Sequence, residues 1–239
     1  MPSFEVLLPV GAIALYLFDT VLLLYYNEVL FVRGIRRWAF VMSSPLLVAG
    51  RRLCFVNPLA PAVAQFRIQW SENDTRPEEE SGAVLQEFLA ALRPVQYLVV
   101  VLLLLLLALP LELFLFGTGL ELLLLMASFY GVILVALIYI YLHRGTLRLS
   151  GRSFAALSFD ALACAPFAIN LVRKLALHRS LAGNPIDFAQ HAFDAPTFAA
   201  LLQAVSERVS EEQRREYGQT PRWLELEQYR QQLLNWRKS

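Results

Sequence analysis

Residues 95–116 read VQYLVVVLLLLLLALPLELFLF, and a second apolar run follows at 120–142 after the connection Gly117-Thr118-Gly119. A helix needs about 20 apolar residues to cross the hydrocarbon core of a bilayer, and both runs are that long. Glycine can supply the positive φ that a tight turn requires. We therefore predict a transmembrane helical hairpin over 95–142.

A third apolar run covers residues 4–26 and is interrupted only by Glu5 and Asp19. It has neither the basic start nor the small-residue cleavage site of a secretory signal peptide. We therefore predict a retained transmembrane helix over 1–26. Together with the hairpin, this predicts a mainly α integral membrane protein with three transmembrane helices.

The composition agrees with this fold class. Hydrophobic residues make up 57% of the 239 residues, charged residues only 17%, and the mean hydropathy is +0.49. Soluble proteins are about 45–50% apolar and about 25% charged, and the net charge of +1 gives no general attraction to nucleic acid. The basic residues are almost all arginine, which we interpret as the codon bias of a GC-rich bacterial genome. Disordered and nucleic-acid-coating proteins are excluded.

The distribution of arginine predicts the orientation. Neither the start of the chain nor the turn at 117–119 contains lysine or arginine, whereas residues 27–94 contain eight arginines. Three more, Arg144, Arg148 and Arg152, follow the apolar run 120–142. Basic residues collect on the cytoplasmic side of a membrane. We therefore expect a multi-pass protein of the bacterial inner membrane, with the N-terminus outside and the C-terminus in the cytoplasm.

A fourth apolar run, 153–172, contains Asp160, Pro166 and Asn170 and has basic residues on both sides. A spanning helix would place one of these basic clusters outside the cell. We therefore interpret 143–185 as a re-entrant or interfacial segment with snorkelling basic ends. A fourth span remains the alternative, because long C-terminal domains translocate largely regardless of charge.

Short β-branched and aromatic stretches, separated by turn residues, fill 27–70. The clearest is 65–70, in which Phe66, Ile68 and Trp70 alternate with polar residues, as in a half-buried strand. These stretches predict a small cytoplasmic antiparallel sheet lying against the membrane. Residues 71–94 then predict a polar loop followed by a short helix over 83–92.

The segment 186–239 has the composition of soluble protein. Asp194 before Pro196, and Thr220 before Pro221, are typical of helix starts. Two amphipathic helices with a short connection predict a cytoplasmic helical hairpin. Their apolar stripes are more often intramolecular core, but they are also the candidate interaction face: Phe198, Leu202, Val205, Val209, Trp223, Tyr229 and Trp236.

Charged groups within apolar segments are functional candidates, because burying them in a bilayer is costly. These candidates are Asp19, Glu112, Glu121 and Asp160. We expect Asp19 to join its helix to a neighbour, with an arginine of the 27–70 region or of another subunit as its partner.

The apolar run 120–142 contains a small-residue pattern. Ala127, Ser128 and Gly131 share its surface and would permit close approach of a second helix. Together they form a candidate helix-packing face.

No phosphate-binding loop, nucleophile elbow or zinc-protease motif occurs in the sequence. Cys54 and Cys164 are far apart and lack metal-ligand spacing. We therefore assign no catalytic, cofactor-binding or metal residue and expect no cofactor.

These features favour a non-enzymatic scaffold or accessory subunit of a larger membrane assembly. Its expected partners are the lipid bilayer and other membrane-protein subunits or further copies of itself, and no nucleic acid. One alternative is a small oligomeric transporter or channel with Asp19 lining a shared cavity. A second is a lipid-modifying enzyme at the cytoplasmic interface.

Overall fold

The computed structural model describes residues 4–34, 37–70, 82–179, 181, 184–216, 218 and 220–236. The chain divides into two compact units, each described separately below. The helical unit comprises Met1–Leu22, Phe55–Ala64 and Ser81–Arg179. The mixed unit comprises Leu23–Cys54, Gln65–Glu80 and Ser180–Ser239. The protein is mostly helical with small antiparallel sheets, in agreement with the predicted mixture of elements.

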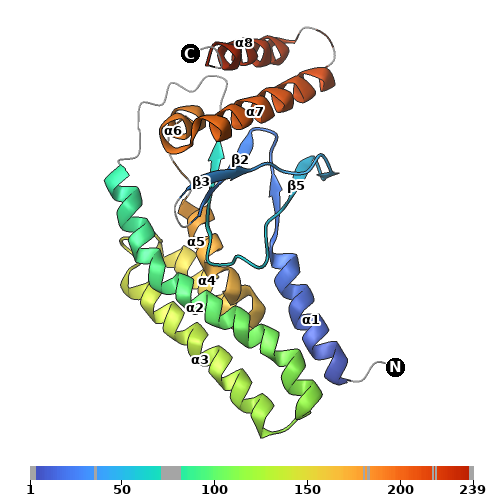
Figure 1. The fold of residues 1–239 in the computed structure, drawn as a ribbon, viewed down its shortest axis with the longest axis vertical. Helices are drawn as coiled ribbons and strands as arrows, with labels where there is room; N and C mark the ends of the chain where they lie inside the picture. The colour runs from blue at the N-terminus through green and yellow to red at the C-terminus, as the bar shows by residue number, and fades with distance from the viewer. Residues whose placement is uncertain are drawn as a thin grey trace. The chain divides into compact units, whose positions relative to one another are not determined.

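The centre of the helical unit is the pair α2 (Gly82–Leu115) and α3 (Leu120–Leu142), which lie side by side (Figure 1). Leu102 and Leu106 of α2 are buried, as are Ile133 and Ile140 of α3. Two helices of the described chain, α2 and α3, are long and apolar enough to cross a membrane. The short helix predicted over 83–92 is the first part of α2, which continues through Pro94.

Helix α1 (Phe4–Asp19) is shorter than the run from which we predicted it. It ends at Asp19, and the apolar residues that follow form strand β1 (Val21–Leu24). The β-branched Val21 and the leucines after it fit a strand as well as a helix, because apolar runs of this length have no distinguishing periodicity. At about 1.5 Å per residue, the 16 residues of α1 measure about 24 Å. The prediction of three full-length spans is therefore not confirmed.

The fourth apolar run is broken into three short elements. Helix α4 (Gly151–Ala163) ends at Cys164, the 3₁₀-helix η1 (Ala165–Asn170) follows, and α5 (Leu171–Arg179) completes the unit. Pro166 lies in the first turn of η1, where its missing N–H costs nothing. The break agrees with the interpretation of 153–172 as something other than one continuous spanning helix.

The strands predicted for 27–70 are present as β2 (Glu28–Arg33), β3 (Trp38–Val41), β4 (Leu47–Val48), β5 (Arg51–Phe55) and β6 (Ala64–Gln69). Together with β1 they form two three-stranded sheets in place of one, with the orders β3-β2-β6 and β1-β5-β4. Strand β2 pairs antiparallel with β3, placing Phe31 opposite Phe40, and β4 pairs antiparallel with β5.

Three helices complete the mixed unit: α6 (Pro185–Ala192), α7 (Ala195–Arg215) and α8 (Pro221–Trp236). The expected caps are present: the Thr197 N–H donates to the Asp194 carboxylate, and the Trp223 N–H donates to the Thr220 hydroxyl. Helices α7 and α8 pack together as the predicted hairpin (Figure 1). The predicted polar loop over 71–81 lies outside the described residues.

Aromatic rings fill the core of the mixed unit. The Phe31 ring on β2 stacks on Phe188 of α6 at 5.6 Å between centroids and contacts Phe193 at 4.9 Å. The Trp38 ring on β3 meets Phe66 of β6 at 5.7 Å. These contacts join α6 to the β3-β2-β6 sheet.

Candidate functional site

The C-terminal end of α1 is the centre of a buried polar cluster in the helical unit. The last carbonyl groups of a helix lack partners within the helix, and the last turn of α1 contains no basic residue. Arg173 of α5 supplies the missing donor, because its guanidinium donates to the main-chain carbonyl of Asp19. A cation at this place also complements the negative end of the helix dipole.

The Asp19 carboxylate extends this cluster through both of its oxygens. Oδ2 accepts a hydrogen bond from the Asn170 side-chain amide at 2.8 Å and lies 3.8 Å from the Arg173 guanidinium. Oδ1 lies 3.3 Å from the Lys174 ammonium, which is also 3.7 Å from the carboxylate of Asp160. We call Asp19, Asp160, Asn170, Arg173 and Lys174 the Asp19 network.

Charges within this network are balanced, with two carboxylates facing two cations. Burial is uneven: the side chain of Arg173 is only 4% exposed and that of Asp19 16%, whereas Asp160 is 54% exposed. A buried charge is tolerated when it is paired and hydrogen-bonded, and removing one partner is strongly destabilising. The arrangement therefore holds α1 against α5, and Asp160 closes the network at its exposed edge.

The structure corrects the expected partner of Asp19. Its partners are Asn170, Arg173 and Lys174, and no arginine of the 27–70 region takes part in the ion pairs described for Asp19. Arg173 and Lys174 directly follow the fourth apolar run, and we interpreted them only as its snorkelling flank. The sequence signal for these partners is that two adjacent cations, Arg173 and Lys174, directly follow an apolar run that contains the polar Asn170.

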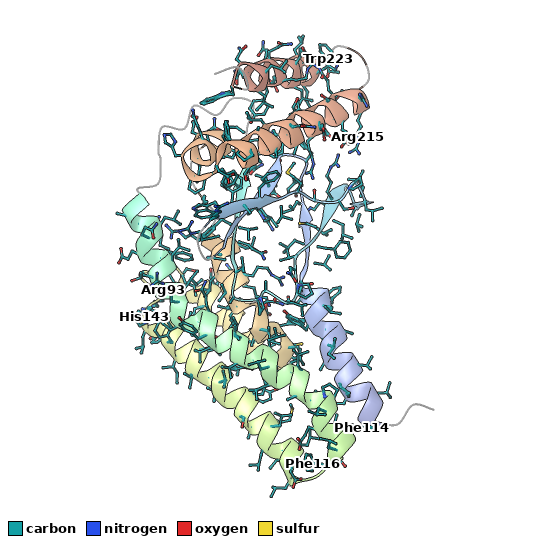
Figure 2. All side chains as sticks on the ribbon, in the orientation of Figure 1. Arg93, Phe114, Phe116, His143, Arg215 and Trp223 are labelled. Atoms are coloured by element: carbon teal, nitrogen blue, oxygen red, sulfur yellow. The ribbon has the colours of Figure 1, made fainter. Side chains whose placement is uncertain are left out.

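Glu112 and Glu121 are not part of the Asp19 network. Glu112 is half-buried in α2, and its Oε1 has no hydrogen-bond partner among the described residues. Glu121 is exposed in the first turn of α3, where the helix dipole favours a carboxylate. Both lie near the turn that joins α2 to α3, at the end where Figure 2 labels Phe114 and Phe116.

The predicted helix-packing residues Ala127, Ser128 and Gly131 do not form the contact between α2 and α3. All three are exposed, and the position of a side chain on Gly131 is open. Four of the five α3 residues that are buried against the rest of the unit are larger: Phe129, Ile133, Leu137 and Ile140. The small-residue face therefore points away from the described part of the helical unit.

An apolar cavity of about 180 Å³ lies among α1, α2, α3 and η1. Its lining is Leu8, Ala12, Leu105, Leu106, Leu109, Met126, Phe129, Ala165 and Pro166. No residue of the Asp19 network contributes to it. The lining contains no charged or hydrogen-bonding side chain, so this cavity offers no polar path.

The predicted interaction face belongs mainly to the core of the mixed unit. Leu202, Val205, Val209 and Tyr229 are buried, and Phe198, Trp223 and Trp236 are partly covered. The four buried residues are therefore covered within the mixed unit, and a partner role for this face stays a prediction. Hydrophobic periodicity shows that a face is covered and does not say whether the same chain covers it.

Sequence reasoning missed two buried arginines in the mixed unit. Arg208 of α7 donates to the main-chain carbonyl of Ser43 at 2.7 Å, and Arg52 of β5 forms a 2.5 Å ion pair with Glu211. Burial, together with the nearby charge of Arg52, lowers the pKa of Arg208 to about 10. Burial also raises the pKa of the Cys54 thiol to about 11, which keeps it protonated and unreactive.

Among the described residues there is no group of three histidine, cysteine, aspartate or glutamate side chains that could hold a metal ion. The chain matches no protein-family model, no curated protein and no solved structure.

Proposed function

We propose that this chain is a multi-pass membrane protein that acts as a non-enzymatic scaffold or accessory subunit of a larger membrane assembly. The supporting observation for the membrane is the surface of α2 and α3. Large apolar side chains along both helices are exposed, with Phe114 86% and Leu104 61% exposed. Contiguous apolar surface of this extent is unfavourable in water and natural in lipid.

In this proposal α2 and α3 cross the bilayer, and α1 enters it as a third, shorter membrane helix. The 13 residues of α4 measure about 20 Å, so this helix does not cross. Ala165 and Pro166 line the same cavity as Leu105 and Leu109, which belong to the apolar run 95–116 of α2. This shared depth favours a re-entrant segment formed by α4, η1 and α5.

The proposed orientation places the N-terminus outside and the C-terminus in the cytoplasm of a bacterial inner membrane. Arg93 of α2 and His143 after α3 lie toward one end of the helix pair, opposite Phe114 and Phe116 (Figure 2). Arg144, Arg148 and Arg152 follow His143 in the chain. Basic residues at one end and none in the opposite turn are typical of a cytoplasmic end.

The Asp19 network supports a scaffold role over transport or catalysis. Its two carboxylates and two cations are paired with each other, and the neighbouring cavity is apolar. A transporter with Asp19 lining a shared cavity would need this carboxylate to face a polar space. A lipid-modifying enzyme would need a nucleophile beside a base.

Partner contacts in the membrane would use the small-residue face of α3. Ala127, Ser128 and Gly131 are exposed, and small side chains let a second helix approach closely. The apolar stripes of α7 and α8 are largely occupied inside the mixed unit, which leaves α3 as the better candidate surface.

Purification in mild detergent, followed by chemical cross-linking and identification of the linked proteins, tests this proposal. We expect a defined partner membrane protein that is lost in Gly131→Leu, since the added side chain would hold the partner helix away. Thr118→Leu adds a similar side chain in the exposed turn and should retain the partner. A homo-oligomer with no other partner, together with solute flux in liposomes that Asp19→Asn abolishes, would contradict a scaffold and support the transporter.

A further inference from the structure

The corner between α3 and α4, residues 143–152, presents three arginines. Arg144, Arg148 and Arg152 are all exposed, whereas Leu147 and Leu149 between them are buried. The backbone closes on itself here, since the Leu149 N–H donates to the Arg144 carbonyl at 2.9 Å. Buried leucines and a closed backbone fix the corner to the helical unit and keep the arginines at its surface.

Aromatic rings from α3 and α4 pack against each other at this corner. The Arg144 guanidinium lies over the Tyr141 ring at 5.1 Å, and the Tyr141 ring packs on Phe154 of α4 at 5.4 Å. Arg152 lies two residues before Phe154, and no ion pair is found for it within the described chain. Arg144 therefore lies beside the packed rings that join α3 to α4, and Arg152 lies in the same first turn of α4 as Phe154.

Arg148 occupies a backbone conformation that ordinarily belongs to glycine. Its φ is +50° at the turn that follows α3, the left-handed region in which a side chain is unfavourable. Helices commonly end with glycine in this conformation. Arg148 adopts this strained conformation and adds a third positive charge to the corner.

Helix α4 leaves this corner with apolar side chains on its surface. Phe159 and Leu162 are exposed, and Arg152 lies near the start of the same helix. The basic start of α4 fits the headgroup level, and its exposed aromatic and aliphatic side chains fit the acyl chains that the re-entrant segment would enter. Tyr141, at the end of α3, is also typical of this level of a membrane.

We propose that the α3–α4 corner binds the phosphate of an anionic phospholipid headgroup through Arg144, Arg148 and Arg152. This inference rests on the membrane location proposed above. The planar guanidinium pairs with phosphate through two parallel hydrogen bonds, which makes arginine better suited to phosphate than lysine. The exposed Phe159 and Leu162 on the same helix favour a lipid over a free phosphate, because acyl chains would cover these apolar side chains and a soluble anion would not.

The test uses the full chain purified in mild detergent and titrated with fluorescent phosphatidylglycerol or phosphatidylcholine. We expect tighter binding of phosphatidylglycerol, and a loss of about fivefold in its affinity for each arginine removed, since each basic residue near a membrane surface contributes about 1 kcal/mol. Binding of phosphatidylcholine should not change. The variants are Arg148→Gly, which relieves the strained turn, and Arg144→Gln combined with Arg152→Gln. Arg214→Gln in α7 removes the same charge elsewhere and should bind as the wild type does.

Equal affinity of the wild type for both lipids would overturn the inference, as would unchanged affinity in the corner variants. Complete displacement of phosphatidylglycerol by an equal concentration of inorganic phosphate would overturn the assignment to a lipid. Thermal unfolding in detergent checks that Arg148→Gly keeps its fold. Membrane location is tested separately by alkaline carbonate extraction of the wild type: release into the supernatant contradicts the proposed function, whereas retention with no lipid preference contradicts only this inference.

Discussion

Replacing Asp19 with asparagine removes the negative charge that Arg173 and Lys174 share, with almost no change in shape. The asparagine side chain can still accept the hydrogen bond from Asn170, so the substitution isolates the electrostatic contribution. Arg173 is affected most, because its side chain is only 4% exposed and water cannot replace the lost carboxylate.

The size of the effect follows from the partners that remain. Removing one member of a buried ion pair costs about 3–5 kcal/mol. Lys174 keeps the Asp160 carboxylate at 3.7 Å, and Arg173 keeps its hydrogen bond to the main-chain carbonyl of residue 19. We therefore expect Asp19→Asn to lower the free energy of unfolding of the helical unit by about 3 kcal/mol, the lower end of that range.

The assay is equilibrium unfolding in mild detergent, followed by far-ultraviolet circular dichroism. Hydrogen–deuterium exchange of peptides from α1 and α5 then locates the loss, since these are the helices that the network joins. Two carboxylates provide controls. Asp160→Asn should cost at most about 1 kcal/mol, because exposed ion pairs contribute little, and Glu121→Gln should stay within about 0.5 kcal/mol of the wild type.

An Asp19→Asn variant as stable as the wild type would mean that the carboxylate contributes nothing to holding α1. Equal destabilisation by Asp19→Asn and Glu121→Gln would mean that the loss at Asp19 is not specific to the Asp19 network. In either case the buried Arg173 would have to be satisfied by its hydrogen bond to the main chain alone.

Three further predictions concern the mixed unit. Thr220→Ala removes the hydroxyl that caps α8 through the Trp223 N–H and should lower the free energy of unfolding by about 1 kcal/mol in chemical denaturation. The hydrogen bond from Arg230 lowers the pKa of Glu227 to about 2 from its ordinary 4.5, so this carboxylate contributes stability above pH 4.5 that is lost as the pH falls from 4.5 to 2. Glu227→Gln should remove that part of the acid dependence, and an unchanged pH profile would contradict it. Cys54, buried and with its pKa raised to about 11, should resist iodoacetamide at neutral pH until the protein unfolds, as followed by mass spectrometry.

Local chemistry made several elements predictable. The alternation of Phe66, Ile68 and Trp70 predicts β6, and the cap-then-proline pairs at 194–196 and 220–221 predict the starts of α7 and α8. Each of these signals lies within a few residues of the structure that it specifies. The turn at 117–119 between α2 and α3 is of the same kind.

The remaining features depend on contacts between distant segments. Val21–Leu24 is apolar enough for a helix, and it forms a strand because a partner strand, β5, lies beside it in the sheet. Asp19 needed a cation, but its partners Arg173 and Lys174 lie more than 150 residues further along the chain. Sequence spacing identified the charge in need of a partner and could not identify the partner.

Sequence patterns were also unable to say which faces the chain itself covers. Leu202 and Val209 form a stripe that is buried within the mixed unit, whereas the small-residue stripe at Ala127 and Gly131 is exposed. Both patterns indicate a face that contacts other side chains or lipid. Only the packing of the whole chain separates a core from a surface that is available to lipid or to a partner.

Cysteine accessibility distinguishes helices α2 and α3 lying in a bilayer from the same helices exposed to water. In a background with Cys54→Ala and Cys164→Ala, single substitutions Leu104→Cys and Arg144→Cys each place a thiol where the chain itself leaves the side chain exposed. The protein is reconstituted in open vesicles and treated with a membrane-impermeant maleimide. We predict that Arg144→Cys reacts and Leu104→Cys does not, because only lipid covers position 104. Reaction of both positions at the same rate would show that the exposed face of α2 lies in water and not in lipid.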